Sequence, residues 1–92
     1  MVAETILKNL GITYPGTYTD NGEYVVELDN DAQFGRVYAV FDHSDDFELI
    51  SDGGFLSSDT VEVEYENEDE GVVAKIEADF ENDVYTLTLY EE

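Results

Sequence analysis

The last third of the chain alternates apolar and polar residues with a period of two, and this pattern restricts the fold more than any other feature. In residues 61–66, Val, Val and Tyr alternate with three glutamates. Residues 72–80 and 84–90 continue the alternation, separated by turn residues at 67–71 and 81–83. Because successive side chains of a strand point to opposite faces, each segment has one apolar face. The pattern predicts a three-stranded antiparallel meander with one face buried.

Two further local signals lie in the first thirty residues. Apolar residues at helical spacing predict a short amphipathic helix over residues 2–10, which Gly11 is expected to end. The dipeptide Asn21-Gly22 predicts a β-hairpin with a type I′ turn between residues 16–20 and 23–29.

The middle of the chain is less decisive. Residues 31–41 fit either a strand or a helix capped by Asp31, and the stripe Phe34, Val37, Tyr38 and Phe41 favours the helix. A short strand is expected at 47–50 and a loop at 51–59. Together these segments predict a single α+β domain over residues 1–92. The N-terminal hairpin and the C-terminal meander form an antiparallel sheet, and two short helices cover one face of it.

The charge of the chain is extreme for its size. Twenty-four of 92 residues are Asp or Glu and three are Lys or Arg, which gives a formal net charge of −21. A small domain usually carries a net charge of magnitude about 2–8, and a larger excess destabilises the compact state by self-repulsion. Seven Tyr and five Phe set the chain apart from disordered acidic segments, which are poor in aromatics. We therefore expect a folded domain with an acidic surface.

Composition also disfavours several function classes. The chain has no cysteine, which excludes disulfides, zinc–thiolate sites and thiol nucleophiles. The single histidine, His43, has no serine in a nucleophile-elbow motif, and no acidic run has the spacing of an EF-hand. We expect neither an enzyme nor a cofactor or metal site. The lack of a signal pattern or a long apolar run predicts a cytoplasmic protein, and anionic membranes and nucleic acids would repel it.

The acidic residues follow the predicted strands and turns. Glu62, Glu64 and Glu66 share a face at a spacing of about 6.6–7 Å, close to that of successive phosphates of a DNA strand. Twenty-one charges correspond to roughly 36 Å of duplex DNA, and a compact chain of this length is about 30 Å across. The predicted partner-binding residues are Glu62, Glu64, Glu66, Glu68, Asp69, Glu70, Glu77 and Asp79, with Asp42, Asp45, Asp46 and Glu48 as a second edge.

A small cysteine-free chain that combines this acidity with interspersed aromatics and strands such as Val61-Glu62-Val63-Glu64-Tyr65-Glu66 resembles the phage-encoded acidic DNA-mimic inhibitors of the anti-CRISPR and anti-restriction type. The resemblance implies protein–protein interaction in the host-cell cytoplasm. The chain would occlude the nucleic-acid-binding site of a basic protein, such as a restriction enzyme or a CRISPR effector nuclease whose arginines read the motif beside the target.

Two alternatives remain at this point. The chain could be a small phage or mobile-element module that binds a basic partner without mimicking DNA. It could also be a salt-adapted domain of a halophile, although 13 Glu against 11 Asp, two Lys against one Arg and plentiful aromatics argue against this. Val25, Val73 and Tyr90 are expected as exposed apolar residues, either a second core layer or a dimer contact. Partner and oligomeric state are left open.

Overall fold

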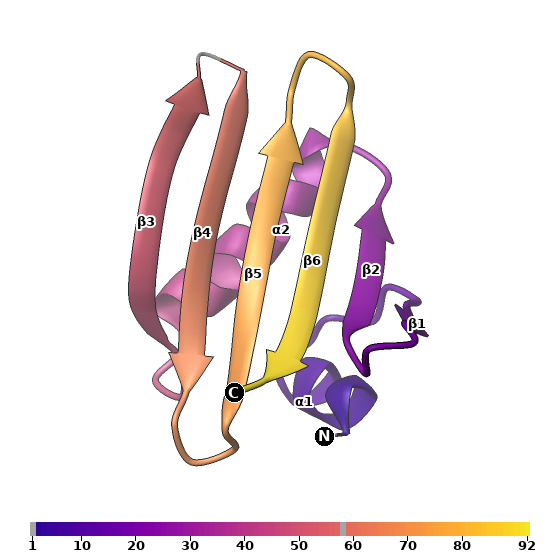
Figure 1. The fold of residues 1–92 in the computed structure, drawn as a ribbon, viewed down its shortest axis with the longest axis vertical. Helices are drawn as coiled ribbons and strands as arrows, with labels where there is room; N and C mark the ends of the chain where they lie inside the picture. The colour runs from indigo at the N-terminus through magenta and orange to yellow at the C-terminus, as the bar shows by residue number, and fades with distance from the viewer. Residues whose placement is uncertain (1, 58) are drawn as a thin grey trace.

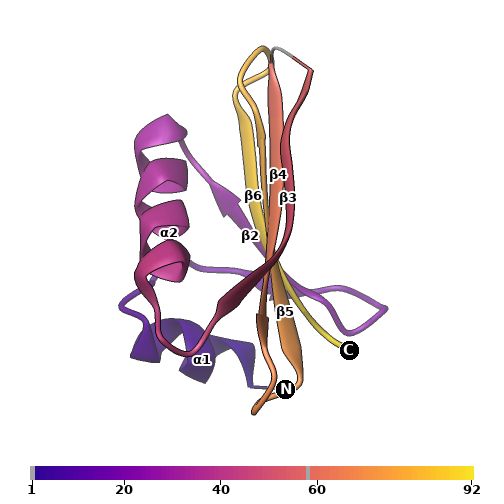
Figure 2. The same ribbon diagram turned by 90° about the vertical axis from the view of Figure 1, so that its left-hand side faces the viewer.

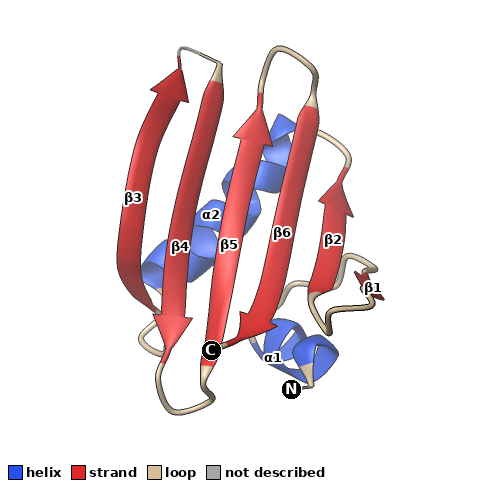
Figure 3. Cartoon of the chain, in the orientation of Figure 1, coloured by secondary structure: helices blue, strands red, loops and turns tan. Residues whose placement is uncertain are grey.

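The computed structural model describes residues 2–57 and 59–92, without the side chains of residues 53–57. A six-stranded antiparallel sheet is covered on one face by two helices (Figures 1 and 3). This confirms the predicted α+β class. The elements are α1 (Ala3–Asn9), β1 (Thr17–Tyr18), β2 (Tyr24–Leu28), α2 (Asp31–His43), β3 (Glu48–Ser57), β4 (Thr60–Asn67), β5 (Val72–Asp79) and β6 (Val84–Glu91).

The strand order is β1-β2-β6-β5-β4-β3, and every neighbouring pair is antiparallel. The last four strands form a meander, and the N-terminal hairpin adds to it along β6. Helix α2 carries the chain diagonally across one face, from β2 to the far edge at β3 (Figure 1). The hairpin and the meander thus belong to one continuous sheet.

Helix α1 forms where the apolar spacing predicts it. It buries Ala3 and Leu7 against the sheet. Gly11 has a φ of +81°, and the N–H of Ile12 donates to the carbonyl of Leu7 at 2.9 Å. The left-handed glycine therefore ends the helix as expected.

The hairpin is present, but its turn is not the predicted type. A type I′ turn needs a positive φ at both central residues, and only Gly22 (+82°) has one, whereas Asn21 does not. Thr19 and Glu23 pair across a three-residue loop: the N–H of Thr19 donates to Glu23 at 2.7 Å, and the N–H of Gly22 donates to Thr19 at 3.0 Å. This is a tight turn followed by a left-handed glycine, the usual three-residue connection.

Helix α2 confirms the helical interpretation of residues 31–41. Its cap is Asn30, one residue earlier than predicted. The Asn30 side chain accepts a hydrogen bond from the N–H of Gln33 at 2.9 Å, and the Gln33 side chain accepts one from the N–H of Asp29 at 2.8 Å. This reciprocal pair satisfies two backbone donors at the start of the helix.

Strand β3 corrects the sequence prediction. The strand begins at Glu48, after the buried Phe47, and runs through the expected loop to Ser57. It pairs with β4 through three register shifts, one of them between Asp52 and Phe55, where Gly53-Gly54 lie. Pairing with β4 gives the backbone groups of this segment hydrogen-bond partners, so sheet pairing overrides the local preference of glycine for a loop. The shifts absorb the irregularity as bulges.

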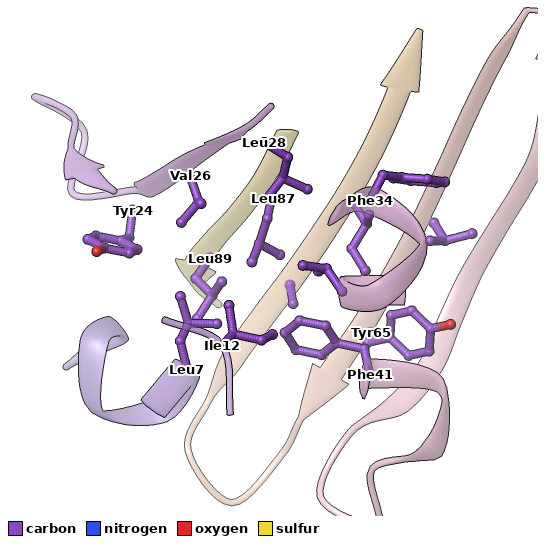
Figure 4. Packing of buried hydrophobic residues seen from close by; sticks show 14 of the residues in the cluster. Leu7, Ile12, Tyr24, Val26, Leu28, Phe34, Phe41, Tyr65, Leu87 and Leu89 are labelled. Atoms are coloured by element: carbon purple, nitrogen blue, oxygen red, sulfur yellow. The ribbon is translucent and has the colours of Figure 1, made fainter. Parts of the chain in front are cut away.

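The core lies between the helices and the sheet (Figure 4). From α2, Phe34, Val37 and Phe41 point into it. The Phe41 ring stacks on Tyr65 with centroids 5.9 Å apart and meets Phe47 edge-on at 4.8 Å. Leu7, Ile12, Val26, Leu87 and Leu89 complete the apolar layer. All of this burial is on the helix side of the sheet, which decides what the other side can present.

Candidate functional site

The face of the sheet turned away from α1 and α2, here called the open face, carries the predicted acidic rows. Both helices lie on the opposite side in Figure 2, and Figure 1 looks onto the open face. Val63 and Tyr65 are buried on the helix side, so the alternating residues of β4 point outward. Pairing in the sheet places further acidic residues on the same face. The predicted residues that lie on the open face are Glu48, Glu62, Glu64, Glu66, Glu77 and Asp79.

Register brings several carboxylates directly opposite each other. Glu62 pairs with Glu77 across β4 and β5, and Glu48 pairs with Glu66 across β3 and β4. Like charges in directly opposed positions destabilise a sheet. Lys75 pairs with Glu64 and reaches the first of these pairs: its Nζ lies 3.4 Å from Oε1 of Glu62 and 3.9 Å from Oε1 of Glu77. One ammonium therefore offsets part of the repulsion within this group.

The carboxylates around Lys75 also favour its protonated form. Burial works against the charged form, but the attraction of Glu77 and Glu62, the hydrogen bond to Glu62 and the charge of Glu64 together raise the pKa of Lys75. The side chain is about one-third exposed, so solvent screens these interactions. Lys75 thus stays protonated throughout the neutral range, and the face keeps its large negative excess.

A second acidic group lies at the end of the sheet near α1. The loop between α2 and β3 approaches the turn between β4 and β5, and the two segments line two adjoining hollows that share Phe47 and Asn67. The Asn67 side chain accepts a hydrogen bond from the N–H of Glu70 at 3.1 Å and so shapes the turn. The predicted residues gathered here are Asp45, Asp46, Glu68, Asp69 and Glu70.

Two predicted residues accept hydrogen bonds from neighbouring residues of the fold. Asp42 lies near the end of α2, on the helix side, where it accepts a hydrogen bond from the hydroxyl of Tyr65 at 3.2 Å. Asp79 accepts hydrogen bonds from the side chain and the backbone N–H of Asn82 in the turn before β6, and these lower its pKa. The structure thus groups Glu48 with the open face and separates Asp42 from it.

Sequence reasoning missed two features of the open face. Glu27 of β2 pairs with Thr86, which pairs with Glu77, so Glu27 continues the row begun by Glu62. The local sequence gives no signal of this, because it depends on β2 lying beside β6. Val73, expected to be exposed, is only 3% exposed, and Val25 and Tyr90 are half-buried.

In the part of the chain that the structure describes, no three or more His, Cys, Asp or Glu side chains come together in a way that could hold a metal ion. No helix among the described residues has the length and apolarity needed to cross a bilayer. Comparison with known proteins gives no family: no protein-family model matches the chain, and neither does any curated protein or solved structure. Function must therefore be argued from charge and shape.

Proposed function

We propose that this protein is an acidic nucleic-acid mimic that inhibits a basic nucleic-acid-binding protein, such as a CRISPR effector nuclease or a restriction enzyme, by occupying its binding site. The observation that carries the proposal is the density of negative charge on a small folded body. The net charge is −21 and the longest extent of the molecule is 34 Å. Duplex DNA reaches the same charge over roughly 36 Å.

The arrangement of the charge supports the same proposal. Along β4, the carboxylates of Glu62, Glu64 and Glu66 repeat at about 6.6–7 Å, and neighbouring strands lie about 4.8 Å apart. The sheet holds these side chains on a stiff support. A basic groove therefore meets an ordered row of anions and does not first have to order a flexible tail.

Binding of this kind would be fast and sensitive to salt. Complementary charge steers two proteins together, and ionic strength screens the attraction. Because the inhibitor would occupy the groove itself, DNA should compete with it. The proposal needs neither a catalytic residue nor a cofactor.

The test is inhibition of DNA cleavage by a panel of CRISPR effector nucleases and restriction enzymes. Two charge-matched variants separate the open face from net charge. One replaces Glu62, Glu64 and Glu66 with Gln; the control replaces the exposed Glu4, Asp20 and Asp31 with the corresponding amides. At about 0.5 kcal/mol per surface ion pair, the open-face variant should inhibit about tenfold less, and the control should stay near wild type.

For an inhibited enzyme, excess DNA duplex and added salt should both relieve inhibition. Inhibition that is insensitive to salt between low and physiological concentrations would refute the proposal. Equal potency of the open-face variant and wild type would also refute it, and would favour a module that binds a basic partner without mimicry.

A further inference from the structure

The open face has two different halves. Strands β3, β4 and β5 contribute most of its carboxylates, whereas β6 contributes Thr86, Thr88 and Tyr90. Tyr90 pairs with Val73, and Val73 pairs with Glu66. Tyr90 therefore lies at the border between the strongly acidic strands and a less charged half, in which Glu27 of β2 lies beside Thr86.

The burial of Val73 indicates how Tyr90 lies. Val73 is on the side away from both helices, yet it is only 3% exposed. Neither helix lies on this face (Figure 2), and the residues in register with Val73 on the two neighbouring strands are Glu66 and Tyr90, so these two side chains are placed to cover it. Tyr90 is half-buried, so part of its ring remains exposed to solvent on this face.

Several carboxylates lie near Tyr90. Burial raises the pKa of Tyr90, and the nearby charges of Glu64, Glu23 and Glu62 raise it further, against the opposing charge of Lys75. Tyr90 therefore stays neutral at physiological pH, with an electron-rich face beside several anions. An aromatic face within reach of carboxylates suits a cation that is both flat and charged.

We propose that the open face binds an arginine-bearing segment of a basic protein, with the Tyr90 ring as the platform for a guanidinium group and Glu64 and Glu66 as its carboxylate acceptors. This rests on the proposed function and specifies the partner that the same face recognises. A guanidinium stacks on aromatic rings and bonds carboxylates through two N–H groups at once, whereas an ammonium is a strongly hydrated point charge.

Electrostatic repulsion disfavours a second copy of this chain as the occupant of the open face. A second copy of this chain would bring another net charge of −21 against the first. Lys75, which belongs to the same face, already lies between Glu62 and Glu77. A cationic partner supplies the countercharge that the face lacks.

The test uses oligoarginine and oligolysine peptides of equal length, titrated into the isotope-labelled protein at low salt and followed by NMR. Arginine contact should shift the ring and backbone signals of Tyr90 together with the amides of β4 and β5. At an exposed site, a cation–π contact corresponds to about two- to fivefold tighter binding of oligoarginine than of oligolysine.

Three variants locate the preference. Tyr90→Leu should lose most of the preference for oligoarginine and keep only the part that the carboxylates contribute, and Tyr90→Phe should keep the preference because it keeps the ring. Tyr14→Leu is the matched control: Tyr14 is also half-buried but packs against the core near α1, so its loss should leave the preference unchanged. The amide spectrum of each variant verifies that it is folded.

The outcomes separate this inference from the proposed function. Equal binding of the two peptides by wild type, or a preference that is undiminished in Tyr90→Leu, overturns the role of Tyr90 and leaves the mimic intact. Failure of both peptides to bind at low salt overturns the two proposals together. Signals that shift on α2 instead of β4–β6 overturn the choice of face.

Discussion

Replacing Lys75 with glutamine removes the basic side chain that lies among the carboxylates of the open face. Lys75 contacts Glu62 at 3.4 Å and Glu77 at 3.9 Å, and these two glutamates are directly opposed across β4 and β5. The substitution therefore breaks two ion pairs and leaves the facing carboxylates without a countercharge. We expect the variant to be less stable than wild type although its side chain is nearly as long.

The magnitude follows from the exposure of the three side chains, which ranges from 31% to 44%. Pairs this exposed are screened by water, and each contributes about 0.2–1 kcal/mol. Two pairs give a loss of about 0.5–2 kcal/mol, which for a domain of this size lowers Tm by roughly 2–16 °C. The matched control is Arg36→Gln, which changes net charge equally at an exposed position of α2 and should cost less than about 0.5 kcal/mol.

The assay is urea denaturation of wild type, Lys75→Gln and Arg36→Gln at low salt and in 1 M NaCl. The difference between the two variants should shrink in high salt, where the Debye length is about 3 Å. Binding should respond in the opposite direction, because Lys75→Gln makes the open face more negative and a basic partner should bind at least as tightly. If Lys75→Gln is as stable as Arg36→Gln at low salt, the described ion pairs do not stabilise the sheet.

Three further predictions concern the fold. Burial, Tyr38 and Asp42 raise the pKa of Tyr65, and the glutamates around Lys75 raise the pKa of Lys75 against the effect of burial. Both groups therefore hold their protons to higher pH in the folded state than in the unfolded state, so the free energy of unfolding should fall as pH rises above about 10. Urea denaturation should show a less steep fall in Tyr65→Phe. Gly16→Ala would place a Cβ 2.7 Å from the Val25 carbonyl oxygen and should lower the stability by about 1–3 kcal/mol. Gly35→Ala places a Cβ with no atom within 4 Å, so it should stabilise α2 by about 0.5–1 kcal/mol and raise Tm. Asn30→Ala removes the cap of α2 and should cost about 1 kcal/mol in the same assay, with a smaller loss in Asp31→Ala, which removes only a charge from the first turn.

The parts of the fold that local pattern decides were predictable. The two-residue period of residues 61–90 depends only on which side of each strand is buried, and Tyr85, Leu87 and Leu89 do share the helix side. The stripe on α2 and the glycine after α1 are likewise local signals. Strand β3 could not be predicted this way, because Gly53-Gly54 indicate a loop and pairing with β4 outweighs this local signal.

The candidate site shows the same division between local and long-range information. The outward direction of Glu62, Glu64 and Glu66 follows from the period alone. The position of Glu27 beside β6, the burial of Val73 and the separation of Asp42 from the acidic rows follow from strand order and helix packing, which couple residues far apart in the chain. Composition predicted that a polyanion exists, and topology determined which residues share its surface.

Salt distinguishes a charge that serves recognition from a charge that serves solvation. Self-repulsion among 24 acidic side chains opposes the compact state, so screening it should stabilise the fold under any interpretation of the acidity. Screening should weaken a complex with a basic partner, because there the same charges attract. A salt-adapted domain has only the first response, and an inhibitory mimic has both with opposite signs. The core is confined to the helix side of the sheet, so the open face can hold its charge at the cost of repulsion alone, without burying a carboxylate, and a cationic partner relieves that repulsion when it binds.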